Sequence, residues 1–581
     1  MKKRILAFVL LVGMVLLCAC EGSSNLDLSR LSPQSLTTPV PAKNAEDIYE
    51  AFMAIASQEV ALEQEEDVTP NSPDPHPDDS QIIISENNRN SVLYGDYLYM
   101  LSNADFKILQ KQSNKLMLIA NVSIAPTQPA NMDYYQFANG IYVSGNRMVI
   151  ILNRSYFTEE EGQLFTTEQT CAYLYDISTR HNPVLLDVFS QDGIYQDVAL
   201  IDSTLYLISN STADLRSTDP AAFLPKVNDN GADITIPTER IYLTDAPGNA
   251  SYCIVSSILI EDAKRSDVCA FLGSCNVTEI TEDNVYLART ARKSLSSDPY
   301  DKNQYSVTDH ATAALTQIVS LSNQPALTLS TACGLAGEAL ALNYSHEQIQ
   351  VITGTTTARY KVFTDETYGW TNRLDEDSTD STLVTALDAS LKTISSIEYP
   401  HPSSAIQSIS FYENTCYITV NRLDKSLAAI TFNPGEDAKI TELTRNDSSM
   451  NHFLFTKEGI LNLSLPDAAQ SSRTLSLSLY DGNNLQLAAG SSFVLDSIPE
   501  GTLLAVGTRS NNVVLLSCGG TVYLLQVGKA IRELGMPKMS IHSGTNFIFD
   551  KNHLYATAPD AIFVVNLQTA QVEDTLSFGV G

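Results

Sequence analysis

The sequence predicts an all-β protein, a β-propeller built from four-stranded antiparallel blades. Two observations support this prediction. Beyond residue 80 the helical 3.6-residue period is almost absent, and short runs rich in Val, Ile, Tyr and Leu are separated by Asn, Asp, Gly and Ser. In addition, two kinds of hairpin alternate, so that a four-stranded unit recurs about every 40 to 80 residues.

The first kind of hairpin has two or three polar residues between its strands, as in SVLYGDYLYML and GIYVSGNRMVIIL. The second kind follows it, as in LYDISTRHNPVLLDVFSQ, where residues 180–183 form the turn of an outer hairpin. A four-stranded sheet cannot bury both faces alone, so the units are expected to stack radially. The alternative, a pair of β-sandwiches, does not account for so regular an alternation.

The number of blades depends on how the ring closes. We count about nine units, including a weak one at 500–533. Because the two chain ends of a propeller often share one blade, we predict eight blades, within a range of seven to nine. The propeller domain is expected over residues 81–581.

The N-terminus has the layout of an export signal. Three basic residues, Lys2 to Arg4, precede an apolar run of 13 residues from Ile5 to Leu17, too short to span a bilayer comfortably. The run ends in LCAC, which resembles the lipobox of bacterial lipoproteins. That resemblance implies a signal peptide over residues 1–19 and a lipid on Cys20. An ordinary cleaved signal with incidental cysteines is the alternative.

Residues 20–80 are expected to be a tether that contains one helix. Asn44 can cap a helix near 44–67, in which Ile48, Phe52, Ile55 and Ala56 share one face. This helix is expected to dock on its own domain or on a partner. The stretch VTPNSPDPHPDDS that follows has the composition of an acidic, Pro-rich linker.

The chain is strongly acidic, with a formal net charge of −31 at pH 7. Such a surface repels phosphate backbones, so nucleic-acid binding is not expected. It also repels anionic lipid headgroups, so membrane affinity would come from the acyl chain on Cys20. A soluble surface needs acidity as well, so the charge by itself indicates no ligand.

The remaining cysteines form no C-x-x-C pair and are odd in number, which is a poor disulfide framework. Most are expected to be small core residues. Cys253 and Cys269 could face each other across a hairpin, although the sequence does not fix the register.

Four stretches carry more than periodicity: LYDISTRHNPVLLDVFSQDGIYQDVALIDSTLYLISN, LAGEALALNYSHEQIQVITGT, AIQSISFYENTCYITVNRLD and GTNFIFDKNHLYATAPDAIFVVNL. In this order they resemble a family of secreted bacterial proteins with a β-propeller domain that is distantly related to WD repeats. The resemblance covers roughly residues 85–581. It implies the propeller fold, but no biochemical activity.

The search for catalytic and ligand-binding motifs finds mainly absences. The sequence has no H-E-x-x-H, no G-x-S-x-G and no phosphate-binding G-x-x-x-x-G-K-[ST]. Tyr368 and Trp370 lie on a predicted loop and could anchor a partner, or could instead cap their own blade. Near Asp229 and Asp233, VNDNGADI suggests a calcium loop but lacks its terminal glutamate, so we expect an insertion of turn residues and no metal site or cofactor.

We therefore predict a lipid-anchored, extracytoplasmic bacterial propeller that acts as a protein- or ligand-binding scaffold, more consistent with a binding module than with an enzyme. Its expected partners are the membrane, through Cys20, and an envelope protein or peptide. The alternative is an envelope hydrolase or glycan-processing enzyme with carboxylates at the propeller centre, which inward acidic side chains with perturbed pKa values would favour. In a third hypothesis the helix near 44–67 docks on a membrane partner.

Overall fold

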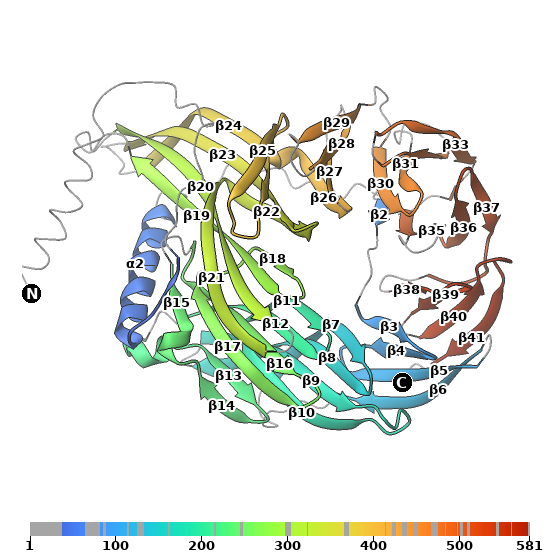
Figure 1. The fold of residues 1–581 in the computed structure, drawn as a ribbon, viewed down its shortest axis with the longest axis horizontal. Coiled ribbons are helices and arrows are strands. Elements are labelled where there is room, and N and C mark those ends of the chain that lie inside the picture. The colour runs from blue at the N-terminus through green and yellow to red at the C-terminus, as the bar shows by residue number, and fades with distance from the viewer. Residues whose placement is uncertain are drawn as a thin grey trace, which may run out of the picture.

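The computed structural model describes residues 38–63, 82–84, 89–112, 115–124, 133–160, 163–213, 217–244, 248–296, 304–321, 324–364, 371–412, 414–420, 426–432, 438–444, 450–465, 474–482, 484–496, 498–499, 503–507, 512–541, 545–558 and 560–578. Their strands form nine antiparallel blades in chain order around a central opening (Figure 1). The predicted propeller is confirmed. A ring of nine lies just beyond the usual range of about four to eight blades.

Blade 1 has the basic four strands, whereas blades 2 and 3 each carry two additional strands. Blade 1 consists of β3 (Ser91–Tyr94), β4 (Tyr97–Leu101), β5 (Asp105–Gln112) and β6 (Lys115–Ser123). Blade 2 consists of β7 (Asp133–Ser144), β8 (Arg147–Glu160), β9 (Gln163–Asp176) and β10 (Val184–Asp192), extended outward by β13 (Lys226–Asp229) and β14 (Ala232–Thr235). Blade 3 consists of β11 (Ile194–Ile201), β12 (Thr204–Thr212), β16 (Ser251–Leu259) and β17 (Lys264–Leu272), extended by β15 (Ile241–Leu243) and β1 (Val40–Pro41).

Blades 4 and 5 are fused into one eight-stranded sheet, because β20 pairs with β23 beyond the body of both blades. Blade 4 consists of β18 (Val277–Ile280), β19 (Asn284–Ser296), β20 (Gln304–Leu321) and β21 (Gln324–Ala336). Blade 5 consists of β22 (Glu338–Ser345), β23 (Gln348–Thr364), β24 (Thr371–Leu387) and β25 (Thr393–Tyr399).

Blades 6 to 9 are shorter and regular. Blade 6 consists of β26 (Ile406–Tyr412), β27 (Thr415–Val420), β28 (Ser426–Thr431) and β29 (Lys439–Thr444). Blade 7 consists of β30 (Met450–Thr456), β31 (Gly459–Leu465), β32 (Leu475–Tyr480) and β33 (Leu487–Leu495). Blade 8 consists of β34 (Leu503–Gly507), β35 (Val513–Cys518), β36 (Thr521–Val527) and β37 (Ile531–Gly535). Blade 9 consists of β38 (Asn546–Phe549), β39 (His553–Thr557), β40 (Ala561–Asn566) and β41 (Val572–Ser577).

The core is a series of apolar layers between neighbouring blades. Side chains alternate between the two faces of each strand, so Leu98 of β4 packs toward blade 9 whereas Tyr99 packs toward blade 2. Each pair of adjacent blades shares one such buried cluster, and the last of them joins blade 9 to blade 1. The ring is therefore closed by packing, as stacked units of one repeat require.

The predicted number of eight blades is wrong, and the reason lies in the closure of the ring. Blade 1 and blade 9 each take all four strands from one contiguous stretch, so the chain ends do not share a blade. The weak unit expected at 500–533 is a complete blade, β34 to β37. The short strand β2 (Ile82–Ile84), which precedes blade 1, pairs in parallel with β34 on the inner edge of blade 8.

The inner and outer hairpins lie where the sequence predicts them. The stretch 174–191 contains parts of β9 and β10, the two outer strands of the body of blade 2. The inner hairpins of blades 1 and 2 close with two-residue turns, which place Gly95 (φ 60°) and Gly145 (φ 57°) in the left-handed region. Glycine enters this region at little cost, which suits such turns.

The predicted helix is confirmed as α2 (Ala45–Glu63), which packs on blade 3 of its own chain. The Asn44 side chain accepts a hydrogen bond from the Asp47 N–H at 2.9 Å, so it caps the helix as expected. Ile48 and Phe52 are fully buried, and the Phe52 ring lies 4.8 Å from that of Tyr252. The apolar face of α2 is thus covered by the propeller itself.

Candidate functional site

The residues to which the sequence analysis assigned lipidation and partner binding lie outside the described part of the chain. Cys20 precedes its first residue, and Tyr368 and Trp370 fall between β23 and β24, within 365–370. The lipidation of Cys20 and the anchoring role of the two aromatic residues stay predictions.

The VNDNGADI segment forms the β13–β14 hairpin. Its turn is held by its own side chains, since Asn228 Nδ2 donates to Asp233 Oδ1 at 2.6 Å and Asn228 Oδ1 accepts from the Gly231 N–H at 2.8 Å. Asp229 accepts a hydrogen bond from Nε of Arg265 at 2.8 Å. Within the described residues, no three or more His, Cys, Asp or Glu side chains are placed to hold a metal. The expected absence of a calcium site near Asp229 and Asp233 stays a prediction.

The register of blade 3 separates the two cysteines that were considered for a disulfide. Cys253 lies opposite Phe271, and Cys269 lies opposite Val255. Both thiols are buried and free. Burial raises the pKa of Cys269 to about 12, so this thiol stays protonated and unreactive at neutral pH.

A polar cluster gathers on the innermost strands of blades 2 and 3, around Arg89. Nη1 of Arg89 donates to the hydroxyl groups of Tyr142 at 3.0 Å and Tyr195 at 3.5 Å. It also donates to the Val198 carbonyl at 3.1 Å and lies 3.5 Å from Oδ1 of Asp197. Arg89 lies in the segment before blade 1, and its side chain contacts blades 2 and 3.

Asp197 extends this cluster to blade 4. Its Oδ2 accepts a hydrogen bond from the Thr278 hydroxyl at 2.7 Å, and the next residue on β18 is Glu279. Burial raises the pKa of Glu279 to about 7, and the negative charge of Asp197 acts in the same direction, while a hydrogen bond from the Tyr344 backbone opposes both. Two carboxyl groups on neighbouring inner strands therefore differ in environment: one is paired with Arg89, and the other is largely desolvated.

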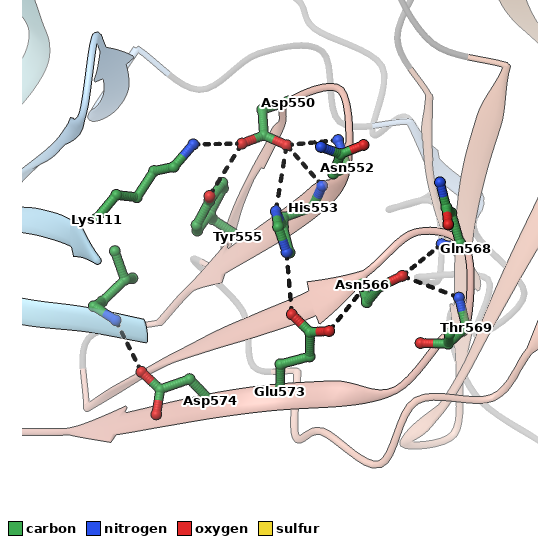
Figure 2. A network of polar contacts seen from close by, with 11 residues as sticks. Lys111, Asp550, Asn552, His553, Tyr555, Asn566, Gln568, Thr569, Glu573 and Asp574 are labelled. Carbon is green, nitrogen blue, oxygen red and sulfur yellow. Dashed lines mark hydrogen bonds and ion pairs between the residues drawn. The ribbon is translucent and has the colours of Figure 1, made fainter. Parts of the chain in front are cut away.

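A second polar network closes the seam between blades 9 and 1. Figure 2 shows Lys111 of β5 reaching Asp550, whose Oδ2 accepts from Nζ at 2.7 Å and from the Tyr555 hydroxyl at 3.1 Å. His553 lies between two carboxylates, with Nε2 3.1 Å from Glu573 and Nδ1 3.7 Å from Asp550. These contacts are directed within and across the seam, which indicates a structural role.

An exposed aromatic surface lies at the start of β7. Tyr135 is 65% exposed and Phe137 is 54% exposed, and both lie on the same face of the strand. Phe157 of β8 adds a third ring, 5.5 Å from that of Tyr135 in an edge-to-face arrangement. Most other aromatic side chains of the described residues are buried or half-buried. We call the surface formed by Tyr135, Phe137 and Phe157 the β7 aromatic face.

The sequence analysis did not find Arg89, Asp197, Glu279 or the β7 aromatic face. One signal was present, because Asp-Val recurs on blades 2 and 3, and in each case the carboxylate accepts a hydrogen bond from the following N–H. For Asp197 this occurs where the register of β11 shifts. The other two pairs, at Asp187 and Asp267, lie on the outer strands β10 and β17, so the recurrence does not single out the inner-strand position of Asp197. No local signal marks Arg89.

Comparison with known proteins places the chain in a family. The model of the beta propeller domain family matches residues 94–424, more than half of the chain. The chain belongs to this family. No curated protein matches it in sequence. Among the described residues, no helix is long and apolar enough to cross a membrane.

Solved structures similar to the chain include Hsv2p of Kluyveromyces lactis. It has 9% sequence identity and a TM-score of 0.29, and the match covers 72% of this chain and 97% of that one. A form of the same protein with loop 6CD replaced by a Gly-Ser linker has 9% identity and a TM-score of 0.26, over 47% of this chain and 78% of that one.

Proposed function

We propose that this propeller is a protein-binding scaffold, tethered to the outer face of a bacterial cell membrane through a lipid on Cys20. The β7 aromatic face carries the binding part of the proposal. Tyr and Phe are enriched in the cores of protein interfaces, because they bury a large area at low cost in conformational entropy. Two such side chains, more than half exposed and adjacent on one face, support a partner-binding surface here.

The tethering part rests on the N-terminal sequence, where a basic start, a short apolar run and LCAC precede the fold. The first described residue is Thr38, so 17 residues, 21–37, lie between it and Cys20. At about 3.4 Å per extended residue, such a stretch reaches on the order of 60 Å. A scaffold on this tether remains close to the membrane.

The experiment is crosslinking and affinity purification from intact cells, with the native protein compared with Cys20→Ala. An envelope protein recovered with the native form and lost with the variant supports a tethered scaffold. The same partner recovered equally with both forms argues against the role of the tether. Recovery of no partner from either form, under conditions in which a control complex is captured, overturns the scaffold function.

The pair of Asp197 and Glu279 favours a second candidate, hydrolysis of an envelope glycan. A general acid needs a carboxyl group whose pKa lies near the working pH, and the pKa of Glu279 is raised to about 7. Incubation of purified cell-wall glycan with the protein, followed by analysis of released fragments, tests this candidate. Release that is lost in Glu279→Gln would support the enzyme, and absence of release from the native protein would exclude it for that substrate.

A further inference from the structure

We propose that the β7 aromatic face and Glu168 together form a recognition site for a cationic side chain, lysine or arginine, of a partner protein. This inference rests on the proposed scaffold function and specifies the chemistry of the partner. Its basis is the register of β7, β8 and β9, which places an anionic group beside the exposed rings.

The site consists of neighbouring rows across three strands. Tyr135 lies opposite Ser155, and Ser155 lies opposite Glu168, so these three side chains share one face. In the next row, Phe137 lies opposite Asn153. Directly opposed side chains have Cβ atoms about 5 Å apart. The β carbon of Glu168 is therefore on the order of 10 Å from that of Tyr135, a span that one long cationic side chain can bridge.

The carboxylate of Glu168 is held in place by neutral donors. Ser155 Oγ lies 2.8 Å and 2.7 Å from its two oxygens, and Asn153 Nδ2 donates to one of them at 3.1 Å. Asn153 is itself fixed, because its Oδ1 accepts a hydrogen bond from the Tyr195 N–H at 3.1 Å. Hydroxyl and amide donors orient the carboxylate without neutralising it. A partner cation would therefore meet a fixed negative charge.

The rings favour the same kind of ligand. The face of an aromatic ring carries negative potential, which attracts guanidinium and ammonium groups within about 6 Å. The opposite face of the same sheet already has this contact, since the Arg154 guanidinium lies 5.0 Å from the centre of the Tyr173 ring. The net charge of −31 draws cations toward the protein in general, and the rings with Glu168 supply a specific place for one.

Tyr134 provides a matched control on the same strand. It is 36% exposed, but it lies on the opposite face of β7, where its ring is 6.4 Å from that of Tyr156. A substitution of Tyr134 changes the exposed aromatic area of β7 without touching the rings beside Glu168.

The test uses a fluorescein-labelled peptide that alternates arginine and glycine, with fluorescence anisotropy as the readout. A peptide with citrulline in place of arginine keeps the shape but lacks the charge. We expect the arginine peptide to bind, and Tyr135→Ser, Phe137→Ser and Glu168→Gln each to weaken it by about five- to tenfold. Tyr134→Ser should bind as the native protein does, and circular dichroism verifies that all variants are folded.

Two outcomes overturn the site. If the three variants bind the arginine peptide as tightly as the native protein, the attraction is the general charge of the chain. If the citrulline peptide binds equally well, the ligand is not a cation. A smaller salt dependence in Glu168→Gln than in Tyr135→Ser would support direct pairing with the carboxylate.

A second experiment separates failure of this site from failure of the scaffold function. A photo-crosslinking amino acid is placed at Tyr135 and, in a separate protein, at Met536, which is 58% exposed next to blade 8. A partner captured from Tyr135 and lost in Glu168→Gln supports both proposals. Capture from Met536 alone overturns the cation site and leaves the scaffold, whereas capture from neither position counts against both.

Discussion

Replacement of Glu279 by glutamine should remove a loss of stability that the native protein shows as the pH rises. The pKa of Glu279 is raised by burial from 4.5 to about 7 in the folded state. A raised pKa means that the folded state holds the proton more tightly than the unfolded chain does. The stability associated with the protonated form is therefore complete below about pH 4.5 and is lost as the pH rises through about 7.

The size of this loss follows from the two pKa values. One unit corresponds to about 1.4 kcal/mol, so a shift from 4.5 to about 7 gives on the order of 3 kcal/mol at high pH. Glutamine has nearly the same shape and carries no charge at any pH. Glu279→Gln should therefore match the native protein near pH 4 and exceed its stability by up to about 3 kcal/mol near pH 8.5.

Chemical denaturation followed by circular dichroism at both pH values measures the effect. Glu282→Gln is the matched control, because Glu282 is exposed in the turn that follows β18 on the same blade. The control should follow the native pH profile. The reasoning is refuted if native protein and Glu279→Gln lose stability in parallel as the pH rises.

Three further predictions concern the seam and the helix. Burial acts to raise the pKa of Asp550, but hydrogen bonds from Lys111 and from two backbone N–H groups lower this pKa overall, so the stability that ionised Asp550 provides is lost as the pH falls through the acid range. Lys111→Met should lower the free energy of unfolding by about 1–3 kcal/mol at pH 7, measured by urea denaturation, and should flatten this acid dependence. Ser91 Oγ and Thr557 Oγ1 lie 3.2 Å apart across the seam, so the double variant Ser91→Cys, Thr557→Cys should form a disulfide under oxidising conditions and melt at a higher temperature than its reduced form. If oxidation leaves the number of free thiols unchanged, this geometry is contradicted. Phe52→Ala should lower the free energy of unfolding by about 3–5 kcal/mol and increase hydrogen exchange in α2, while the backbone amides of blades 6 to 9 stay protected. A uniform loss of protection would show that the helix does not unfold as a separate unit.

Most of the fold could be predicted from the sequence because the signals for strands and turns are local. Inner hairpins mark eight of the nine blades in the sequence, and the ninth corresponds to the weak unit counted at 500–533. The error of one blade came from the assumption that the chain ends share strands. The strand before blade 1, Ile82–Ile84, pairs instead with β34, more than 400 residues away. Strand pairing over such a distance leaves no local trace in the chain.

The candidate sites were less predictable for the same reason. Asp197 and Glu279 are both inner-strand residues of consecutive blades, so an alignment of the repeats could have placed them near each other. Arg89 joins them from outside the repeats, and only the path of the chain into the ring brings it there. The partnership of Tyr135 with Glu168 depends on the register of three strands, which a pattern of exposed aromatic residues does not reveal.

Closure of the ring by two complete blades has a consequence for how such a protein can change its size. Blades 1, 6, 7 and 9 are each one self-contained stretch of sequence, and the seam consists of side-chain contacts rather than of a strand borrowed from the far end. Duplication or deletion of one of these four stretches in the gene would leave every remaining strand with its partners, whereas loss of blade 8 would remove the partner of β2. The circumference of the ring is therefore free to vary by whole units, with only the side chains of one interface left to adapt.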